Sequence, residues 1–151
     1  MSQSFMQVYL HLIWSTKNRA PFLQDPDVRK DLHEYLGGTC NGIECPVLRV
    51  GGVEDHVHVL CRMGKSHTVP GILSTLKRES SLWIKDRALE LPDFYWQAGY
   101  GAFSVSPSHI KALMQYIADQ EAHHRTESFQ DEFRRLCKKY GAAIDERYVW
   151  D

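Results

Sequence analysis

Stretches with strand-like and helix-like hydrophobic patterns alternate along this chain. Four runs rich in apolar, aromatic and β-branched residues predict strands, at residues 5–16, 46–50, 56–63 and 94–105. Gly51-Gly52 and an acidic turn separate the second run from the third, so we expect these two to pair as a hairpin. Gly99 and Gly101 interrupt the fourth run.

Apolar residues at helical spacing fill most of the remaining chain and predict four helices. The predicted starts are Asp25-Pro26, Thr68, Ser106-Pro107 and Ser128, and the predicted ends are Gly37-Gly38, His124 and Gly141. Each start combines a short side chain that can accept a hydrogen bond with the first residues of an apolar stripe.

The order of these elements is β-α-β-β-α-β followed by two more helices. This order predicts an α+β fold of the ferredoxin-like type, with an antiparallel sheet, helices on one face and two additional C-terminal helices. No linker or repeat divides the sequence, so we expect one domain over residues 1–151. The fold alone implies no chemistry.

Composition excludes several classes of protein. No apolar run approaches the roughly 20 residues of a membrane span, and the N-terminus lacks the pattern of a signal peptide. We therefore expect a cytoplasmic protein without a membrane partner. Cys40, Cys45, Cys61 and Cys137 form no CxxC pair, which favours reduced, buried thiols.

The formal net charge of −1 does not suggest a strongly basic nucleic-acid binder, so only local clusters could bind phosphate. Lys17 and Arg19 follow the first apolar run, while Lys77 and Arg78 belong to a basic central segment. These four residues are candidate DNA contacts. The alternative is that each cluster is simply a solvated face.

Two histidines on a predicted strand offer half of a metal site. His56 and His58 are two residues apart, so their imidazoles project from the same face of the strand. A His-x-His pair alone is weak, because structural histidines are common. Asp55 just before the pair could orient one imidazole, or it could only cap a turn.

The third predicted helix adds a phenol and a carboxamide. Tyr116 and Gln120 are four residues apart and share one helix face, about 6 Å apart along the axis. A Tyr and a Gln at the edge of a buried stripe are usually structural. Combined with His56 and His58, however, Gln120 could hold a divalent cation that leaves positions free for phosphate oxygens, next to the phenol of Tyr116. Attack by the phenol on a phosphodiester would form a covalent phosphotyrosine and conserve the energy of the broken bond.

Ordered sequence blocks over nearly the whole chain resemble the HUH-class single-tyrosine transposases of small bacterial insertion sequences. The blocks are YLHLIWSTKNR (9–19), DHVH (55–58), WQAGYGAFSVS (96–106), YIADQ (116–120) and DERYVW (145–150). The domesticated transposases associated with repeated extragenic palindromes are relatives within this class. Asp119 stands where the family often has Asn, which leaves the local hydrogen bonding open.

The resemblance implies that Tyr116 is the nucleophile and that His56, His58 and Gln120 are the metal ligands. It also implies a magnesium or manganese cofactor, recognition of subterminal DNA hairpins, a 5′-phosphotyrosine intermediate on single-stranded DNA, and a homodimer. Imidazole ligands favour manganese over magnesium, and zinc or nickel could bind in a purified sample. Two other functions remain open: a module of the same fold that binds structured nucleic acid without cleaving it, and a metal-dependent phosphodiesterase that activates water.

Overall fold

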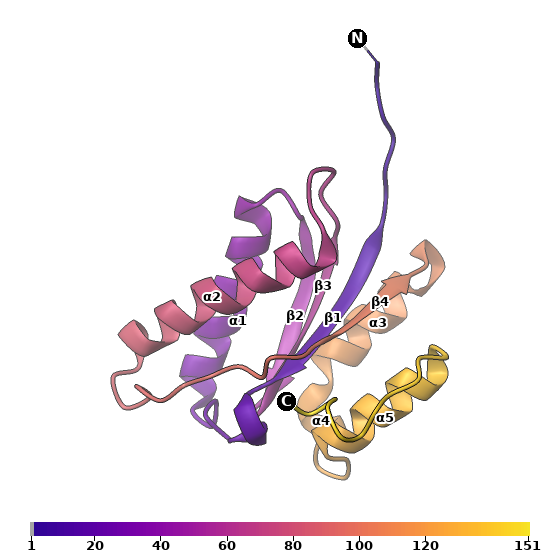
Figure 1. The fold of residues 1–151 in the computed structure, drawn as a ribbon. Coiled ribbons are helices and arrows are strands. Elements are labelled where there is room, and N and C mark those ends of the chain that lie inside the picture. Colours follow the sequence, from indigo (N-terminus) through magenta and orange to yellow (C-terminus); the bar gives the residue numbers. More distant parts are fainter. Residues whose placement is uncertain (1) are drawn as a thin grey trace.

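The computed structural model describes residues 2–151, which form a four-stranded antiparallel sheet between two layers of helices (Figure 1). The strands are β1 (Tyr9–Ser15), β2 (Val47–Val53), β3 (His56–Arg62) and β4 (Gly101–Val105). The helices are α1 (Pro26–Gly42), α2 (Val69–Arg87), α3 (Ile110–Ala118), α4 (Gln120–His123) and α5 (Phe129–Lys139), with short 3₁₀ turns η1 (Lys17–Arg19) and η2 (Pro107–His109). The strand order β2-β3-β1-β4 and the βαββαβ sequence confirm the predicted fold class.

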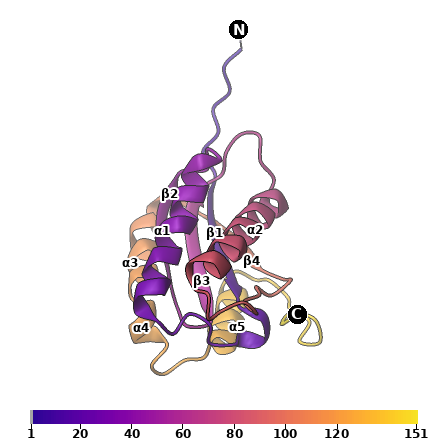
Figure 2. The ribbon, with the colours of Figure 1, turned by 90° about the vertical axis from the view of Figure 1, so that its left-hand side faces the viewer.

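The helices cover both faces of the sheet. α1 and α2 lie on one face, and α3, α4 and α5 lie on the other (Figures 1 and 2). Alternate side chains of β3 point to opposite faces of the sheet. Val57 and Val59 pack in the core beneath α1 and α2, whereas Leu60 packs with α3. The two C-terminal helices of the prediction, of which the first divides into α3 and α4, therefore supply a second layer.

The three longest helices start where the sequence predicted. Each begins with a side-chain oxygen that accepts a hydrogen bond from a backbone N–H of the first turn, a donor without a partner inside the helix. The pairs are Asp25 with Asp27 at 2.9 Å, Thr68 with Gly71 at 3.1 Å and Ser128 with Asp131 at 3.1 Å.

Two predicted helix boundaries are wrong. The Gly37-Gly38 pair does not end α1, which continues to Gly42. Neither glycine has the positive φ of a typical helix end, and a Cβ on Gly37 would make an ordinary contact with Val47 at 3.4 Å. The predicted helix over residues 106–124 is interrupted at Asp119, whose φ of −94° and ψ of 17° separate α3 from α4.

The segment before β4 forms only an isolated β-bridge, between Thr16 and Trp96, so the predicted strand over residues 94–105 shortens to β4. A side chain holds the residues that follow this bridge. The ammonium group of Lys77 donates hydrogen bonds to the carbonyls of Gln97, Ala98 and Gly99 at 2.9, 3.2 and 2.8 Å. Such a centre fixes the main chain without the repeating hydrogen bonds of a sheet.

The last residues dock against the end of the sheet. The backbone N–H of Gly99 donates to the carbonyl of Asp151 at 2.9 Å, and Arg19 donates to the carbonyl of Trp150 at 2.8 Å. The indole of Trp150 lies edge-on to Phe133 of α5, with ring centroids 5.9 Å apart. The tail thus helps to fix α5 on the sheet. Within residues 2–151, no helix has the length and apolar character needed to cross a bilayer.

Candidate active site

Two histidines of β3 project side by side toward α3, α4 and α5. The ring centroids of His56 and His58 lie 5.2 Å apart, and neither side chain is exposed. Val57, between them, packs in the opposite core. The strand therefore presents the imidazole pair to one face, as its alternation predicted.

Hydrogen bonds hold His56 from both sides. Its Nδ1 lies 2.7 Å from Oδ1 of Asp55, and its Nε2 lies 2.8 Å from Oε1 of Gln120. Burial lowers the pKa of His56, but the hydrogen bonds to Asp55 and Glu132 outweigh burial and raise the pKa to about 9. His56 is therefore an imidazolium at neutral pH and donates from both nitrogens, so it would have to release the Nε2 proton before that nitrogen could bind a metal ion. As the sequence predicted, Gln120 lies beside the histidines of β3, and it does so within a single chain.

A buried carboxylate that sequence reasoning missed lies at the centre of the site. Glu132 of α5 has no exposed surface. Its oxygens contact His58 Nε2 (3.1 Å), His56 Nε2 (3.2 Å), His124 Nε2 (3.0 Å), Gln120 Nε2 (2.8 Å) and the hydroxyl of Tyr116. Burial would raise the pKa of Glu132, but its electrostatic interaction with His58 and its hydrogen bonds to His124 and His56 hold the pKa below its usual range. Glu132 therefore remains a carboxylate.

The pattern of α5 contained a signal for this residue. Phe129, Phe133 and Leu136 mark the buried stripe of the helix, and Glu132 lies within the same stripe. An acidic side chain on a buried face needs charged or hydrogen-bonding partners. Histidines elsewhere in the chain were the available partners, and His124 is the nearest along the sequence.

Tyr116 of α3 reaches the same carboxylate. Its hydroxyl donates to Oε2 of Glu132 and accepts a hydrogen bond from Nη2 of Arg135 at 2.8 Å. Its ring lies edge-on to His58 and stacks on His123, with centroid distances of 6.0 and 4.5 Å. Burial and the charge of Glu132 raise the pKa of Tyr116, while Arg135 opposes part of this rise. The phenol is therefore protonated at neutral pH.

Arg135 has its own anchor. Its Nε and Nη2 donate to the two carboxylate oxygens of Glu127 at 2.9 and 3.0 Å. Tyr116, His123 and Arg135 line a surface cavity of about 650 Å³. The phenol therefore borders open space, in contrast to His56 and Glu132, which are fully buried.

His11 of β1 supports His58 on the side away from Glu132. Its Nε2 lies 2.8 Å from Nδ1 of His58, and the two rings stack with centroids 5.1 Å apart. Burial lowers the pKa of His11 to about 3, so this imidazole is neutral. Nε2 of a neutral His11 can accept a hydrogen bond from Nδ1–H of His58, which would leave the Nε2 lone pair of His58 free for a metal ion.

The chemistry of the donor set fits a divalent cation. One ligand atom each from His56, His58 and Glu132 lies within 4.8 Å of the other two. Gln120 offers a further oxygen beside His56. Two imidazoles with oxygen donors suit manganese, zinc or nickel better than magnesium, which prefers oxygen ligands throughout.

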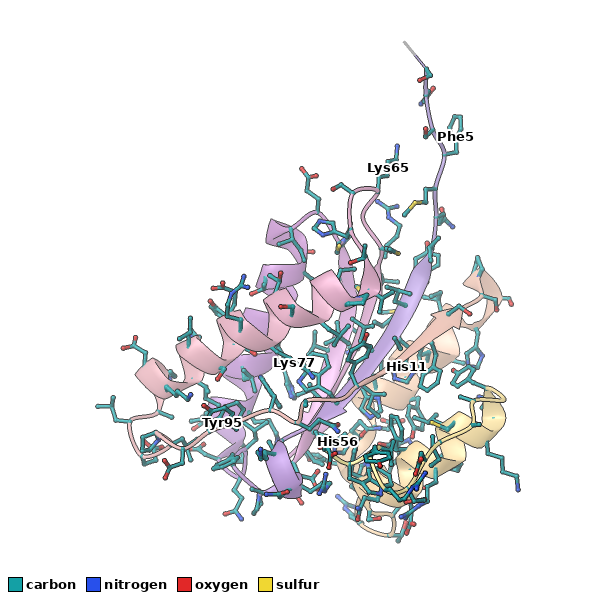
Figure 3. The ribbon with its side chains drawn as sticks, in the orientation of Figure 1. Phe5, His11, His56, Lys65, Lys77 and Tyr95 are labelled. Atoms are coloured by element: carbon teal, nitrogen blue, oxygen red, sulfur yellow. The ribbon has the colours of Figure 1, made fainter. Side chains whose placement is uncertain are left out.

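The four basic candidates for DNA contact are not part of this cluster. Burial lowers the pKa of Lys77 to about 8, and its ammonium points to the segment before β4, while His56 lies on the side of α4 and α5 (Figure 3). Arg78 is exposed on α2, across the sheet from the site. Lys17 is exposed in η1, and Arg19 binds the tail. Within residues 2–151, no hydrogen bond links these side chains to the site.

Comparisons with known proteins agree on a family. The family profile described as "Transposase IS200 like" matches residues 4–120. No curated protein gives a significant match. One similar crystal structure is a candidate transposase from Deinococcus radiodurans R1, with 25% identity and a TM-score of 0.62 over 80% of this chain and 98% of that chain. Another is the REP-associated tyrosine transposase bound to a REP hairpin, with 11% identity and a TM-score of 0.58 over 82% and 73% of the two chains. At that identity, the second likeness shows the fold alone.

Proposed function

Because the chain belongs to the IS200-like transposase family, we propose that it cuts and rejoins single-stranded DNA through Tyr116. One observation carries this proposal: the phenol of Tyr116 and the imidazoles of His56 and His58 meet on one buried carboxylate, Glu132. A nucleophile and a metal-binding pair within one hydrogen-bond network support a shared role at one phosphate.

In the proposed step, Oη of Tyr116 attacks the phosphorus of a phosphodiester. The new bond joins Oη to phosphorus, and the bond from phosphorus to the 3′ oxygen of the preceding nucleotide breaks. The phenolic proton moves to Glu132, which already accepts the hydrogen bond from Tyr116, and finally to the released 3′-hydroxyl. The 5′-phosphotyrosine keeps the energy of the broken bond, so attack by another 3′-hydroxyl reverses the step.

The two oxygens of Glu132 face different groups, which suits two roles. Oε1 lies toward His56 and His58, whereas Oε2 lies toward Tyr116 and Gln120. His56, His58 and an oxygen of Gln120 or Glu132 would hold manganese or magnesium. Such an ion polarises the phosphodiester and offsets the charge that develops on it. Asp55 would orient His56 through Nδ1.

We further propose that the DNA substrate carries a hairpin next to the cleaved strand. The REP-associated neighbour, which is bound to a REP hairpin, supports this choice through the shared fold. We also expect a homodimer. The presence of Tyr116 and both histidines in one chain favours sites that are complete within each copy.

A hairpin-binding module without cleavage is the second candidate. The burial of the site favours this second candidate, because the side chains that would bind metal are at most 1% exposed. These are His56, His58, Gln120 and Glu132. A phosphate would have to displace the side chains that cover the imidazoles, Gln120 and Glu132, before it could reach them.

The test is covalent capture of DNA. Protein is mixed with a single-stranded oligonucleotide that carries a hairpin, with and without manganese, and denaturing gels detect a protein–DNA adduct. Wild type should form the adduct only with the metal, whereas Tyr116→Phe should bind the hairpin but form none. Tyr148→Phe is the matched control, because Tyr148 is 64% exposed and remote from the site.

Three results would reject the proposed mechanism. An undiminished adduct with Tyr116→Phe would show that another group attacks the phosphorus. Hairpin binding without any adduct, across metals and oligonucleotides, would support the binding module. Solvent oxygen in the product phosphate would identify a phosphodiesterase.

A further inference from the structure

A second cavity adjoins the candidate active site. It has a volume of about 280 Å³ and lies between α1, β2 and the junction of α3 with α4. Gln120 connects the two places, because its Oε1 meets His56 while the residue also forms part of the cavity wall.

The charged lining of this cavity is mainly positive. Its charged residues are Arg29, Lys30, Arg49 and Glu121. Glu121 is already paired with Arg29 at 2.9 Å. Lys30 of α1 and Arg49 of β2 are exposed and form no ion pair within residues 2–151. Two uncompensated cations at one cavity, in a chain of net charge −1, favour an anionic ligand.

Close packing fixes the position of this cavity relative to Tyr116. A Cβ on Gly51 would lie only 2.5 Å from the carbonyl oxygen of Ile117. Only glycine therefore allows α3 to rest directly on β2 at this point. Because Ile117 follows Tyr116, the same contact sets the spacing between the cavity and the phenol.

A second hollow lies next to the cavity. It shares His33, Arg49 and Val50 with the cavity and extends along α1 to Asn41, and its other charged lining residue is Glu34. From Arg29 to Asn41 the helix rises about 18 Å, at roughly 1.5 Å per residue. A single DNA strand that leaves the site along these two hollows would pass Arg49, which lines both.

We propose that Lys30 and Arg49 bind a backbone phosphate in the single-stranded segment of the DNA that is cut. The identity of the ligand rests on the proposed function. Phosphate contacts fix the register of a strand without reading its sequence. The cavity would thereby help to set which phosphodiester reaches Tyr116.

The experiment neutralises one phosphate at a time. Hairpin oligonucleotides with a single methylphosphonate at successive positions of the single-stranded flank are bound to Tyr116→Phe protein, which removes cleavage. At one position, the neutral linkage should weaken binding about tenfold. Adding Lys30→Ala and Arg49→Ala together should abolish this sensitivity. The double substitution should also reduce the slope of log affinity against log salt by about 0.7 for each phosphate that the protein no longer neutralises.

Arg87→Ala is the matched control, since it removes a positive charge that pairs with Asp31 and does not line the cavity. This variant should keep the sensitivity at the same linkage. The proposal is overturned if no flank position distinguishes Lys30→Ala/Arg49→Ala from Arg87→Ala, or if the sensitive linkage lies in the hairpin stem. This binding experiment and the adduct experiment can fail independently. Wild type could form the covalent adduct although no single phosphate depends on Lys30 and Arg49, or such a phosphate could exist although no adduct forms.

Discussion

The hydroxyl of Tyr116 is hydrogen-bonded to the carboxylate of Glu132, 16 residues later in the chain. This contact joins α3 to α5 over the face of the sheet that carries His56 and His58. It gives the proposed nucleophile a proton acceptor and, in the same arrangement, shields the imidazoles from solvent.

Replacing Glu132 by Gln should destabilise the protein and weaken metal binding. The variant keeps the shape but removes the negative charge that faces the imidazolium of His56. Loss of one partner from a buried ion pair costs about 3 kcal/mol. Urea unfolding at pH 7 and calorimetric titration with manganese measure the two effects. Glu121→Gln, whose side chain is 70% exposed, is the control; equal stability and metal affinity of the two variants would contradict the central position of Glu132.

Replacing Arg135 by Gln should slow adduct formation about a hundredfold, the typical effect of removing one donor aimed at developing charge. A phosphorus bonded to Oη of Tyr116 brings its free oxygens within reach of this guanidinium, which lies 2.8 Å from Oη. Single-turnover kinetics on denaturing gels measure the rate. Arg134→Gln is the matched control, because Arg134 pairs with Glu146 and not with Tyr116. Similar rates of adduct formation for the two variants would argue against a role of Arg135 at the phosphate.

Replacing Gly51 by Ala should lower the free energy of unfolding by about 1–3 kcal/mol, because its Cβ would collide with the carbonyl of Ile117. Gly38→Ala should instead raise it by up to about 1 kcal/mol, since no atom lies within 4 Å of a Cβ in that helical position. Urea denaturation of both variants gives the comparison. The two substitutions should change the free energy of unfolding in opposite directions. A change in the same direction for both would contradict the close approach of α3 to β2.

Acidification should destabilise the protein partly through His33. Burial lowers the pKa of His33 to about 4 in the folded protein, against about 6.5 in the unfolded chain. Between these values the unfolded chain binds more protons, so the free energy of unfolding falls as the pH decreases from 6.5 to 4. The full shift corresponds to about 3 kcal/mol. In urea titrations, the free energy of unfolding of His33→Gln should fall less over this pH range than that of wild type. An equal fall in both proteins would show that His33 does not contribute to the acid destabilisation.

Local pattern was sufficient to predict the residues whose positions depend on one element. Strand alternation placed His56 and His58 together. Helical spacing predicted that Tyr116 and Gln120 point the same way, and both side chains contact Glu132, although the helix is interrupted between them. Capping side chains such as Thr68 also marked helix starts, since their hydrogen bonds lie within a single turn.

Residues whose partners come from distant segments could not be placed in this way. Glu132 acquires its position only when α5 covers the second face of the sheet, and no local pattern in α5 states which face it covers. Lys77 was a candidate phosphate contact, yet the folded chain surrounds its ammonium with carbonyls about 20 residues away.

The location of the phenol and the imidazole pair on one polypeptide has a consequence for mixed assemblies. A copy with Tyr116→Phe and a copy with His56→Ala would each lack one half of the same centre. Mixing them should therefore not restore adduct formation, whatever number of copies associates. Diluting wild type with either defective copy should reduce activity only in proportion to the number of intact chains.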